Sequence, residues 1–166
     1  MDKATAYKTI TTTNGKHVTV DSTNFAWLSE WWWYAKKHKH TYYACRHENG
    51  RTIYMHRQIL GLEHGDGILT DHADGNGLNN YESNLRACNF AQNSQNQTKK
   101  RRYKNRAITS SFKGVSWDKN TGKWRVKIGC CGKQLHLGLF QSEVIAAKVY
   151  DKKAKELYGE FAHANF

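Results

Sequence analysis

An adjacent Asp-His pair, Asp71 and His72, begins the segment DHADGNGLNNYESNLRACNFAQN. A histidine can take up a proton near neutral pH, and an Asp carboxylate is a hard oxygen ligand for a divalent cation. Asn84 follows His72 by twelve residues, and Asn93 follows Asn84 by nine. An asparagine carboxamide can tie a loop to the backbone or offer an oxygen ligand. This combination indicates a metal site with a general base beside it.

The segment DGNGLNN, just after this pair, is rich in residues that tolerate turns and left-handed backbone conformations. Adjacent side chains on a strand point to opposite faces, so Asp71 and His72 need a clamped loop to act on one bound phosphate. An ordinary surface turn explains the same composition, because Asp, Asn and Gly are the commonest turn formers. An EF-hand calcium loop does not, because its periodic acidic ligands and closing Glu are missing.

The elements that must position these side chains lie on both sides of the loop. The runs YKTITT and KHVTV are typical of short strands, and YMHRQILGL has enough apolar residues for a short helix leading into the Asp-His pair. The Asn-rich segment after the loop is expected to be helical. Six aromatic residues between Phe25 and Tyr34 are expected to form a core, although such rings also stack on bases.

The net charge of +12 is concentrated in the C-terminal part of the chain. Residues 1–97 have ten Lys and Arg against nine Asp and Glu, whereas residues 98–166 have sixteen against five. This asymmetry favours nucleic acid as the partner. The segment TKKRRYKNRAIT, residues 98–109, has six positive charges and no acidic residue, which predicts a basic linker or an arm that lies along phosphates.

Residues beyond this linker alternate as a small antiparallel sheet does. In KWRVKI apolar and basic residues alternate, so one face is expected to be apolar and the other basic. In KQLHLGLF the leucines Leu135, Leu137 and Leu139 are expected on one face. With FKGVSW as a first strand and GCCGK as a turn, the pattern predicts a three-stranded meander.

The segment SEVIAAKVYDKKAKELYG predicts a helix that begins after the N-cap Ser142 and stops at Gly159. Its apolar residues recur at three- and four-residue steps, which gives one apolar stripe. This stripe is expected to cover the apolar face of the sheet. The basic face then stays bare, and a face of this kind suits the DNA major groove.

Membrane and disulfide-rich classes are excluded by composition. No run approaches the roughly 18 apolar residues of a membrane span, and the N-terminal residues lack the apolar centre of a secretory signal. The four cysteines include an adjacent pair but no C-x-x-C spacing. We therefore expect a soluble cytoplasmic protein with no membrane partner.

The segments MHRQILG and DHADGNGLNNYESNLRACNFAQN resemble the HNH homing-endonuclease family. The resemblance implies a hairpin and a helix that grip one divalent ion. It implies that His72 is the general base and that Asn84 holds the loop and orients this base. It also implies that Asp71 and Asn93 are the metal ligands. An all-oxygen ligand set favours Mg2+ or Mn2+, one per active site, and no zinc is expected.

The segments GVSWDKNTGKWRVKI and HLGLFQSEVIAAKVYDKKAKELYGEFAHANF resemble an AP2/ERF-type DNA-binding domain, of the kind fused to phage and mobile-intron nucleases. The resemblance implies that the sheet face binds DNA. Ser116, Trp117 and Asp118 stand where the plant members cluster base-reading arginines. A sequence preference is therefore not carried over.

Double-stranded DNA is thus the expected partner. The side chains expected to contact it are Arg57, Arg86, Lys99, Lys100, Arg101, Arg102, Lys113, Trp117, Lys123, Arg125, Lys127 and His136. His56 matches a recurrent HNH position, for which the resemblance implies a structural or phosphate-facing role. One active-site set per chain indicates nicking by a monomer, whereas a dimer could cut both strands.

The expected fold class is α+β, with an N-terminal ββα-metal (HNH) nuclease domain and a small three-stranded antiparallel sheet packed on one helix (AP2). The expected domains are residues 1–97, which include a β-rich lead-in, and residues 110–166, joined by the linker 98–109. The expected function is a site-preferring DNA endonuclease that uses one divalent metal and a His base. The alternative is a non-catalytic AP2-type regulator with a degenerate nuclease half. RNA binding would use the same basic surface but would leave the metal set unexplained.

Overall fold

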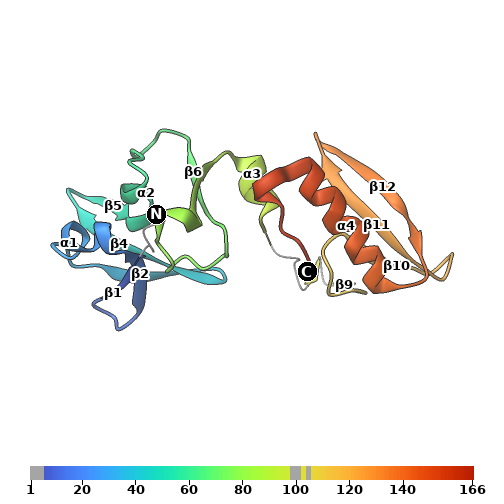
Figure 1. Ribbon diagram of the computed structural model, residues 1–166, viewed down its shortest axis with the longest axis horizontal. Coiled ribbons are helices and arrows are strands. Elements are labelled where there is room, and N and C mark those ends of the chain that lie inside the picture. Colours follow the sequence, from blue (N-terminus) through green and yellow to red (C-terminus); the bar gives the residue numbers. More distant parts are fainter. Residues whose placement is uncertain (1–5, 98–101, 104–105) are drawn as a thin grey trace. The chain divides into compact units, whose positions relative to one another are not determined.

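The computed structural model describes residues 6–97, 102–103 and 106–166. The chain divides into two compact units, Met1–Asn93 and Ser94–Phe166. Its secondary structure is mixed, with several small antiparallel sheets and few helices (Figure 1). None of the helices in the described residues is long and apolar enough to cross a membrane.

The first unit builds small antiparallel sheets and short helices around one apolar core. Its elements are β1 (Tyr7–Thr11), β2 (His17–Asp21), α1 (Ser22–Leu28), β3 (Tyr34–His38), β4 (Thr41–Glu48), β5 (Arg51–Tyr54), α2 (Met55–Ile59), β6 (Leu69–His72), the 3-10 turn η1 (Glu82–Asn84) and β7 (Leu85–Cys88), and α3 (Phe90–Gln95) follows at its end. Strands β1 and β2 form a hairpin, β3, β4 and β5 form a meander, and β6 pairs with β7. The strands expected near the N-terminus are therefore confirmed.

The aromatic residues of this unit divide between core and surface. Trp33 is buried, and Phe25 and Trp27 pack against the same core beside the aliphatic side chains of β2. Trp31 and Trp32 are 39% and 86% exposed. The expected aromatic core is confirmed for Phe25, Trp27 and Trp33. It is wrong for Trp31 and Trp32, because the turn between α1 and β3 turns them outward, and Tyr34 on β3 is half-buried.

The sequence predicted a helix for the Asn-rich segment after the loop, but the structure shows a strand followed by a short helix. Its first part is β7, which pairs antiparallel with β6 so that Asp71 lies opposite Arg86 and His72 opposite Leu85. The helical part, α3, begins at Phe90. Pairing with β6 buries Leu85 and satisfies backbone groups, and these tertiary contacts outweigh local helix propensity.

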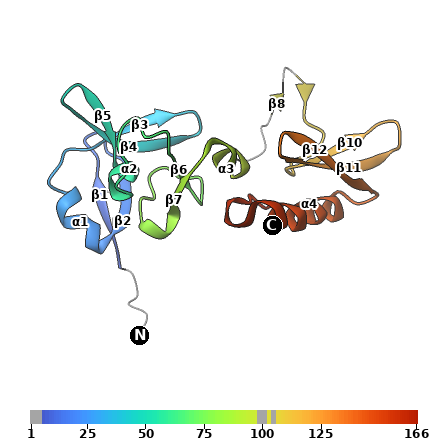
Figure 2. The same cartoon turned by 90° about the horizontal axis from the view of Figure 1, so that it is seen from above.

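The second unit is a three-stranded antiparallel sheet covered on one face by one helix. Its elements are β8 (Arg102–Tyr103), β9 (Arg106–Ala107), β10 (Val115–Asp118), β11 (Lys123–Cys130), β12 (Lys133–Phe140), α4 (Glu143–Tyr158) and the 3-10 turn η2 (Gly159–Phe161). The sheet order is β10-β11-β12, and Figure 2 shows α4 lying along one side of it. The predicted meander and helix are confirmed. Within the predicted linker, β8 and β9 form a short pair.

Helix α4 begins and ends where the sequence predicts. The Ser142 side chain accepts a hydrogen bond from the Ile145 amide at 3.4 Å, and Gly159 takes a positive φ of 55° after the last turn. The buried stripe, including Tyr150, packs against the apolar face of β11. Gly114 allows this packing, because a Cβ there would lie 1.9 Å from the Tyr150 ring and its φ is 75°.

A β-bulge changes the expected face of one leucine. The register between β11 and β12 shifts at Val126 and Lys127, opposite Gly138, whose φ is 129°. Leu137 packs against the helix-side core, but Leu139 pairs with Arg125 and is 38% exposed. The prediction that all three leucines of β12 share a face is therefore wrong, because a bulge breaks the two-residue period.

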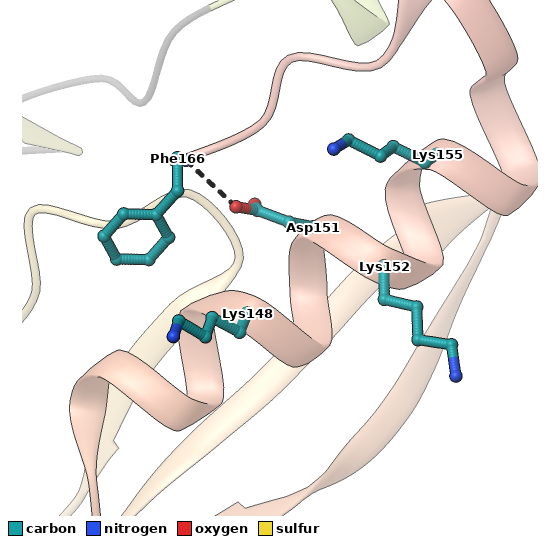
Figure 3. A pocket seen from close by; sticks show the side chains of 5 residues that line it. All are labelled: Lys148, Asp151, Lys152, Lys155 and Phe166. Atoms are coloured by element: carbon teal, nitrogen blue, oxygen red, sulfur yellow. Dashed lines mark hydrogen bonds between the residues drawn. The ribbon is translucent and has the colours of Figure 1, made fainter.

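The last residues of the chain are tied back to α4. The buried Asp151 carboxylate accepts hydrogen bonds from the backbone amides of Asn165 at 2.8 Å and Phe166 at 3.0 Å (Figure 3). The Asn165 carboxamide oxygen accepts from the Lys113 amide at 2.6 Å. One buried carboxylate thus joins the helix, the C-terminal tail and the segment before β10.

Candidate active site and DNA-binding surface

Strand β6 places Asp71 and His72 side by side in a buried position, 5% and 4% exposed. The His72 ring packs against two other rings, with centroid distances of 5.1 Å to His56 and 5.6 Å to Tyr43. Burial lowers the pKa of the His72 imidazole, although Asn80 and nearby carboxylates act in the opposite direction. The ring is therefore held in place and favours its neutral form, which a general base requires.

Asn80, which the sequence analysis missed, is one side chain within hydrogen-bond distance of His72. Its Oδ1 lies 3.2 Å from His72 Nε2, and the residue is fully buried. Its backbone amide donates to the Thr19 carbonyl at 2.7 Å, which ties it to β2. In the sequence, Asn80 is one more turn-forming residue of DGNGLNN, so only its burial distinguishes it.

The Asn84 side chain forms hydrogen bonds with the loop residues Asp74 and Asn79. Its Oδ1 accepts from the Asp74 amide at 3.0 Å, and its Nδ2 donates to Asp74 Oδ1 at 3.0 Å and to the Asn79 carbonyl at 2.7 Å. Its own carbonyl accepts from the Ala73 amide at 2.9 Å. These bonds clamp the loop from both sides. The predicted role of Asn84 in orienting His72 stays a prediction, and Asn80 lies within hydrogen-bond distance of the His72 ring.

Gly77 brings the loop close to the β3-β4-β5 sheet. A Cβ at this position would lie 2.4 Å from the Tyr42 carbonyl and from the Tyr43 ring. The Gly77 amide also donates to Thr41 Oγ1 at 2.8 Å. Only glycine allows this approach, so the loop is held by packing as well as by hydrogen bonds.

Asp71 forms an ion pair with Arg86, its cross-strand partner in β7. The two side chains are 6% and 12% exposed, so both charges are largely removed from water. A buried charge of this kind needs a paired partner. Asp71 is thus an anion that already has a cation beside it.

The two residues expected to hold a metal both carry oxygen donors. Asp71 offers a carboxylate, and Asn93, half-buried on α3, offers a carboxamide that has no hydrogen-bond partner within the part of the chain that the structure describes. Oxygen donors of these types suit Mg2+ or Mn2+. Across the described residues, no three His, Cys, Asp or Glu side chains are gathered so as to hold a metal.

His56 is buried, and its ring packs against the His72 ring. It lies on α2 at the start of the segment that leads into β6 (Figure 1), and its ring also stacks on Tyr54 at 5.4 Å. Burial, followed by the charges of His72 and Arg57, lowers the pKa of His56 to about 3. It therefore supports the His72 ring as an uncharged neighbour, in agreement with a structural role.

The arginines of the first unit that were expected to contact phosphates make internal contacts. Arg57 donates to the Ile68 carbonyl at 2.6 Å, to the Glu63 carbonyl at 2.5 Å and to Asp66 Oδ1 at 2.8 Å. It closes the loop between α2 and β6. Arg86 pairs with Asp71. Their DNA contacts stay predictions.

The face of the second sheet that α4 leaves uncovered is basic but not uniformly so. The register places Lys127 opposite His136 and Arg125 opposite Leu139, away from the helix-side core. Lys123 is opposite Asp118, whose carboxylate forms an ion pair with Arg125. The open face therefore combines cations, one acid and one exposed leucine.

The remaining residues predicted to bind DNA lie elsewhere. Trp117 packs edge-on against Trp124 at 4.9 Å, and their pairing places Trp117 on the helix side of the sheet. Lys113 Nζ donates to the Gln95 carbonyl at 2.5 Å, and burial lowers the pKa of Lys113 to about 8. Lys99, Lys100 and Arg101 lie outside the described residues, as does the side chain of Arg102. Their contacts with DNA also stay predictions.

No family model matches this sequence. The chain is 34% identical over 96 residues to protein 3.8 of Escherichia phage T7, which covers 58% of this chain and 74% of the relative. It is 30% identical over 142 residues to the uncharacterized HNH endonuclease L560 of Acanthamoeba polyphaga mimivirus, which covers 83% of this chain and 68% of the relative. The chain belongs to the HNH endonuclease family.

A third similarity concerns a shorter part of the chain. It is 40% identical over 68 residues to the AP2-like ethylene-responsive transcription factor TOE2 of Arabidopsis thaliana, which is 41% of this chain. The chain spans only 14% of that plant protein. APETALA2-like protein 2 of Oryza sativa has the same identity over the same length. The chain therefore spans less than a fifth of the length of these plant relatives.

Proposed function

We propose that this protein is a DNA endonuclease in which the first unit hydrolyses a phosphodiester bond and the second, an AP2-type domain, binds the duplex. The observation that carries the proposal is the buried Asp71 and His72 pair at the end of β6, with the loop behind it clamped by Asn84. A protein that only binds DNA has no need of a buried histidine base next to a carboxylate. Membership of the HNH family supports the same reaction.

His72 would take the proton from the attacking water onto its imidazole, while the clamped loop keeps the ring from turning away. Asp71 and Asn93 would hold the metal. A bound Mg2+ or Mn2+ supplies positive charge where the phosphate and the departing 3′ oxygen become more negative. Arg86, the ion-pair partner of Asp71, would contact a phosphate oxygen. A ββα-metal arrangement of β6, β7 and α3 is part of this proposal.

The open face of the second sheet would lie against the duplex. Its cations would contact phosphates, which positions the protein, and any base contacts would come from the same face. The similarity to AP2-like plant proteins supports this role. The basic segment before β10 would add phosphate contacts.

The first test is cleavage of a supercoiled plasmid with Mg2+, with Mn2+ and with EDTA. We expect nicked or linear DNA only with metal, and a loss of about 100- to 10,000-fold in rate for His72→Ala with duplex affinity unchanged. His64→Ala removes an exposed histidine and is the matched control. A wild type that binds the duplex but never cuts it would contradict the enzymatic proposal.

A DNA-binding regulator without cleavage is the second candidate. It is favoured by the similarity to AP2-like transcription factors and by the ion pair that occupies the Asp71 carboxylate. The same plasmid assay separates the two. Competition between duplex DNA and structured RNA tests the partner, and preferential retention of RNA would exclude both candidates.

A further inference from the structure

The turn between β3 and β4 carries a run of basic side chains. Residues 36–40 read KKHKH, and all five side chains are exposed. We call this segment the basic turn. It contains Lys36, Lys37 and Lys39, which are three of the ten Lys and Arg in residues 1–97. Positive charge is therefore concentrated at one place in a unit whose total charge is nearly balanced.

Other cations of the first unit have partners within the protein. Arg46, Arg57 and Arg86 form ion pairs with acidic side chains. Lys8 and Lys16 lie over aromatic rings, with their ammonium groups 4.8 and 5.0 Å from the ring centroids. Within the residues that the structure describes, the lysine side chains of the basic turn have no ion pair, hydrogen bond or ring contact. These three cations are therefore available to an external anion.

The residue types of the basic turn do not favour the turn itself. His38 pairs with Thr41, so Lys39 and His40 form a two-residue loop, in which Lys39 has a φ of 43°. Gly, Asn and Asp are the residues that favour a positive φ in such a loop. Neighbouring lysines also repel one another, and a bound polyanion offsets this repulsion. The composition therefore indicates binding rather than stability.

One face of the basic turn continues to the catalytic pair. Lys36 lies opposite Tyr43 in the β3-β4 pair, and His38 is two residues further along β3, so these side chains share one face of the sheet. The Tyr43 ring lies 5.6 Å from the His38 ring and 5.6 Å from the His72 ring, between centroids. The loop after His72 also reaches this ring, because a Cβ at Gly77 would lie 2.4 Å from it. A ligand at His72 is therefore beside the basic turn.

We propose that the basic turn binds the phosphate backbone of the DNA strand beside the bond that the first unit cleaves. This inference rests on the proposed function, in which Asp71 and His72 define where that bond lies. Neighbouring phosphates of one strand are about 3.4 Å apart along the duplex axis, so a strand that reaches His72 brings its next phosphates toward Lys36 and His38. Such contacts carry no sequence information, and they fix the position of the strand. The first unit then has a DNA affinity of its own.

Duplex binding in EDTA tests this inference without cleavage. In the full chain, Lys36→Gln combined with Lys39→Gln removes two charges from the basic turn. We expect the salt dependence of duplex affinity to flatten by about 1.8 in log-log slope and the affinity to fall on the order of 10-fold. Cleavage with Mg2+ should then need about 10-fold more protein for its half-maximal rate.

The matched control is Lys8→Gln combined with Arg51→Gln, which removes the same charge from the same unit. Arg51 is exposed at the start of β5, at the opposite end of β4 from the basic turn. We expect this control to change the affinity and the slope much less. All four substitutions replace exposed side chains, so the thermal midpoints of both variants should stay at the wild-type value.

A second measurement needs no variant. Acylation of lysine amines, followed by mass spectrometry, shows which amines a bound duplex covers. In the wild type in EDTA, we expect the three lysines of the basic turn to react several-fold more slowly with the duplex bound. Lys8 should react at the same rate with and without it.

Three results would overturn the inference. The first is an equal effect of the two variant pairs on duplex affinity, and the second is no protection of the basic turn by the duplex. The third is a basic-turn variant that keeps its duplex affinity but loses retention of structured RNA, which would assign the segment to RNA. If the wild type binds the duplex but never cuts it, the proposed function fails, while protection still decides whether the basic turn binds the backbone.

Discussion

The two units contain the same ion pair in different surroundings. Asp71 and Arg86 in the first unit are 6% and 12% exposed, whereas Asp118 and Arg125 in the second are 6% and 37% exposed. Both pairs join neighbouring antiparallel strands. Arg86 is largely buried, whereas Arg125 is partly exposed on the open sheet face. The comparison separates a buried polar network suited to chemistry from a partly exposed one suited to binding.

The two units also differ in net charge and in the make-up of their buried cores. The first unit buries several polar side chains, including Asn80, Asn84 and His56, and its part of the chain is almost neutral. The second unit has an apolar core between sheet and helix with the buried carboxylates Asp118 and Asp151, and most of its described cations are exposed. Surface charge attracts a polyanion at low cost, whereas buried polar groups keep their geometry only if each is held by others. This difference favours catalysis in one unit and affinity in the other.

Replacing the acid of each pair tests this division with the largest expected effect. Asp71→Asn keeps the shape of the side chain but removes its charge, so we expect loss of Mn2+ binding and a drop in cleavage of about 1,000-fold or more. Asp118→Asn is the matched change in the other unit, and it should leave the single-turnover rate at saturating protein within about threefold of wild type. Calorimetry with Mn2+ and plasmid cleavage measure both. Cleavage that survives Asp71→Asn would remove this carboxylate from the metal site.

A glycine substitution should break the second unit alone. In Gly114→Ala the new Cβ would meet the Tyr150 ring at 1.9 Å, at a positive φ. We expect the free energy of unfolding of this unit to fall by about 2–4 kcal/mol. Gly122→Ala also has a positive φ but nothing within 4 Å, so it should cost about 1 kcal/mol. Calorimetry should show the transition of the first unit unchanged, and a shift of both transitions would contradict independent cores.

Neutralising the open sheet face should weaken binding without affecting chemistry. For Lys123→Gln combined with Lys127→Gln we expect the salt dependence of duplex affinity to flatten by about 1.8 in log-log slope. The control removes the same charge from α4, where Lys148 and Lys152 line a hollow on the outer surface (Figure 3). Lys148→Gln combined with Lys152→Gln should change the slope much less. Equal effects of the two pairs would mean that net charge, rather than the sheet face, sets the affinity.

The smallest expected effect concerns Lys113. Burial lowers the pKa of its amine from 10.5 to about 8 in the folded unit. Between these values the unfolded chain binds the proton and the folded unit does not, so the unfolding free energy rises as pH increases through this range. We expect a gain of roughly 1 kcal/mol or less relative to Lys113→Gln, because solvent screens a half-buried amine. Denaturation of both proteins at pH 7 and pH 10 measures it, and an unchanged difference would contradict the shifted pKa.

Much of the second unit follows from the sequence because its signals are local. The alternation in KWRVKI correctly predicts which residues of β11 face α4, and the caps of α4 are found at Ser142 and Gly159. The face of Leu139 was wrong, because a bulge depends on how β11 and β12 pair. The two-residue alternation along one strand does not indicate where its pairing register with the neighbouring strand shifts.

The candidate site was predicted only in part. Asp71 and His72 end strand β6, and Asn84 forms hydrogen bonds with the loop that follows them, whereas their roles in chemistry stay predictions. The structure has strand β7 where a helix was expected after the loop, and Asn80, which was not predicted, lies within hydrogen-bond distance of His72. Composition marks Asn80 as a turn former, and nothing local shows that β2 buries it. The position of Asn93 on α3 is confirmed, whereas its role as a ligand stays a prediction.

The sequence by itself determined the charge asymmetry, the strand and helix periods and the residue types available for chemistry, because these depend on neighbours along the chain. Only the tertiary structure decided which groups meet. It set Arg86 against Asp71, His56 against His72, and Asn80 between the base and β2. Each of these contacts joins segments brought together by strand pairing and by burial of a shared core, which no local pattern encodes.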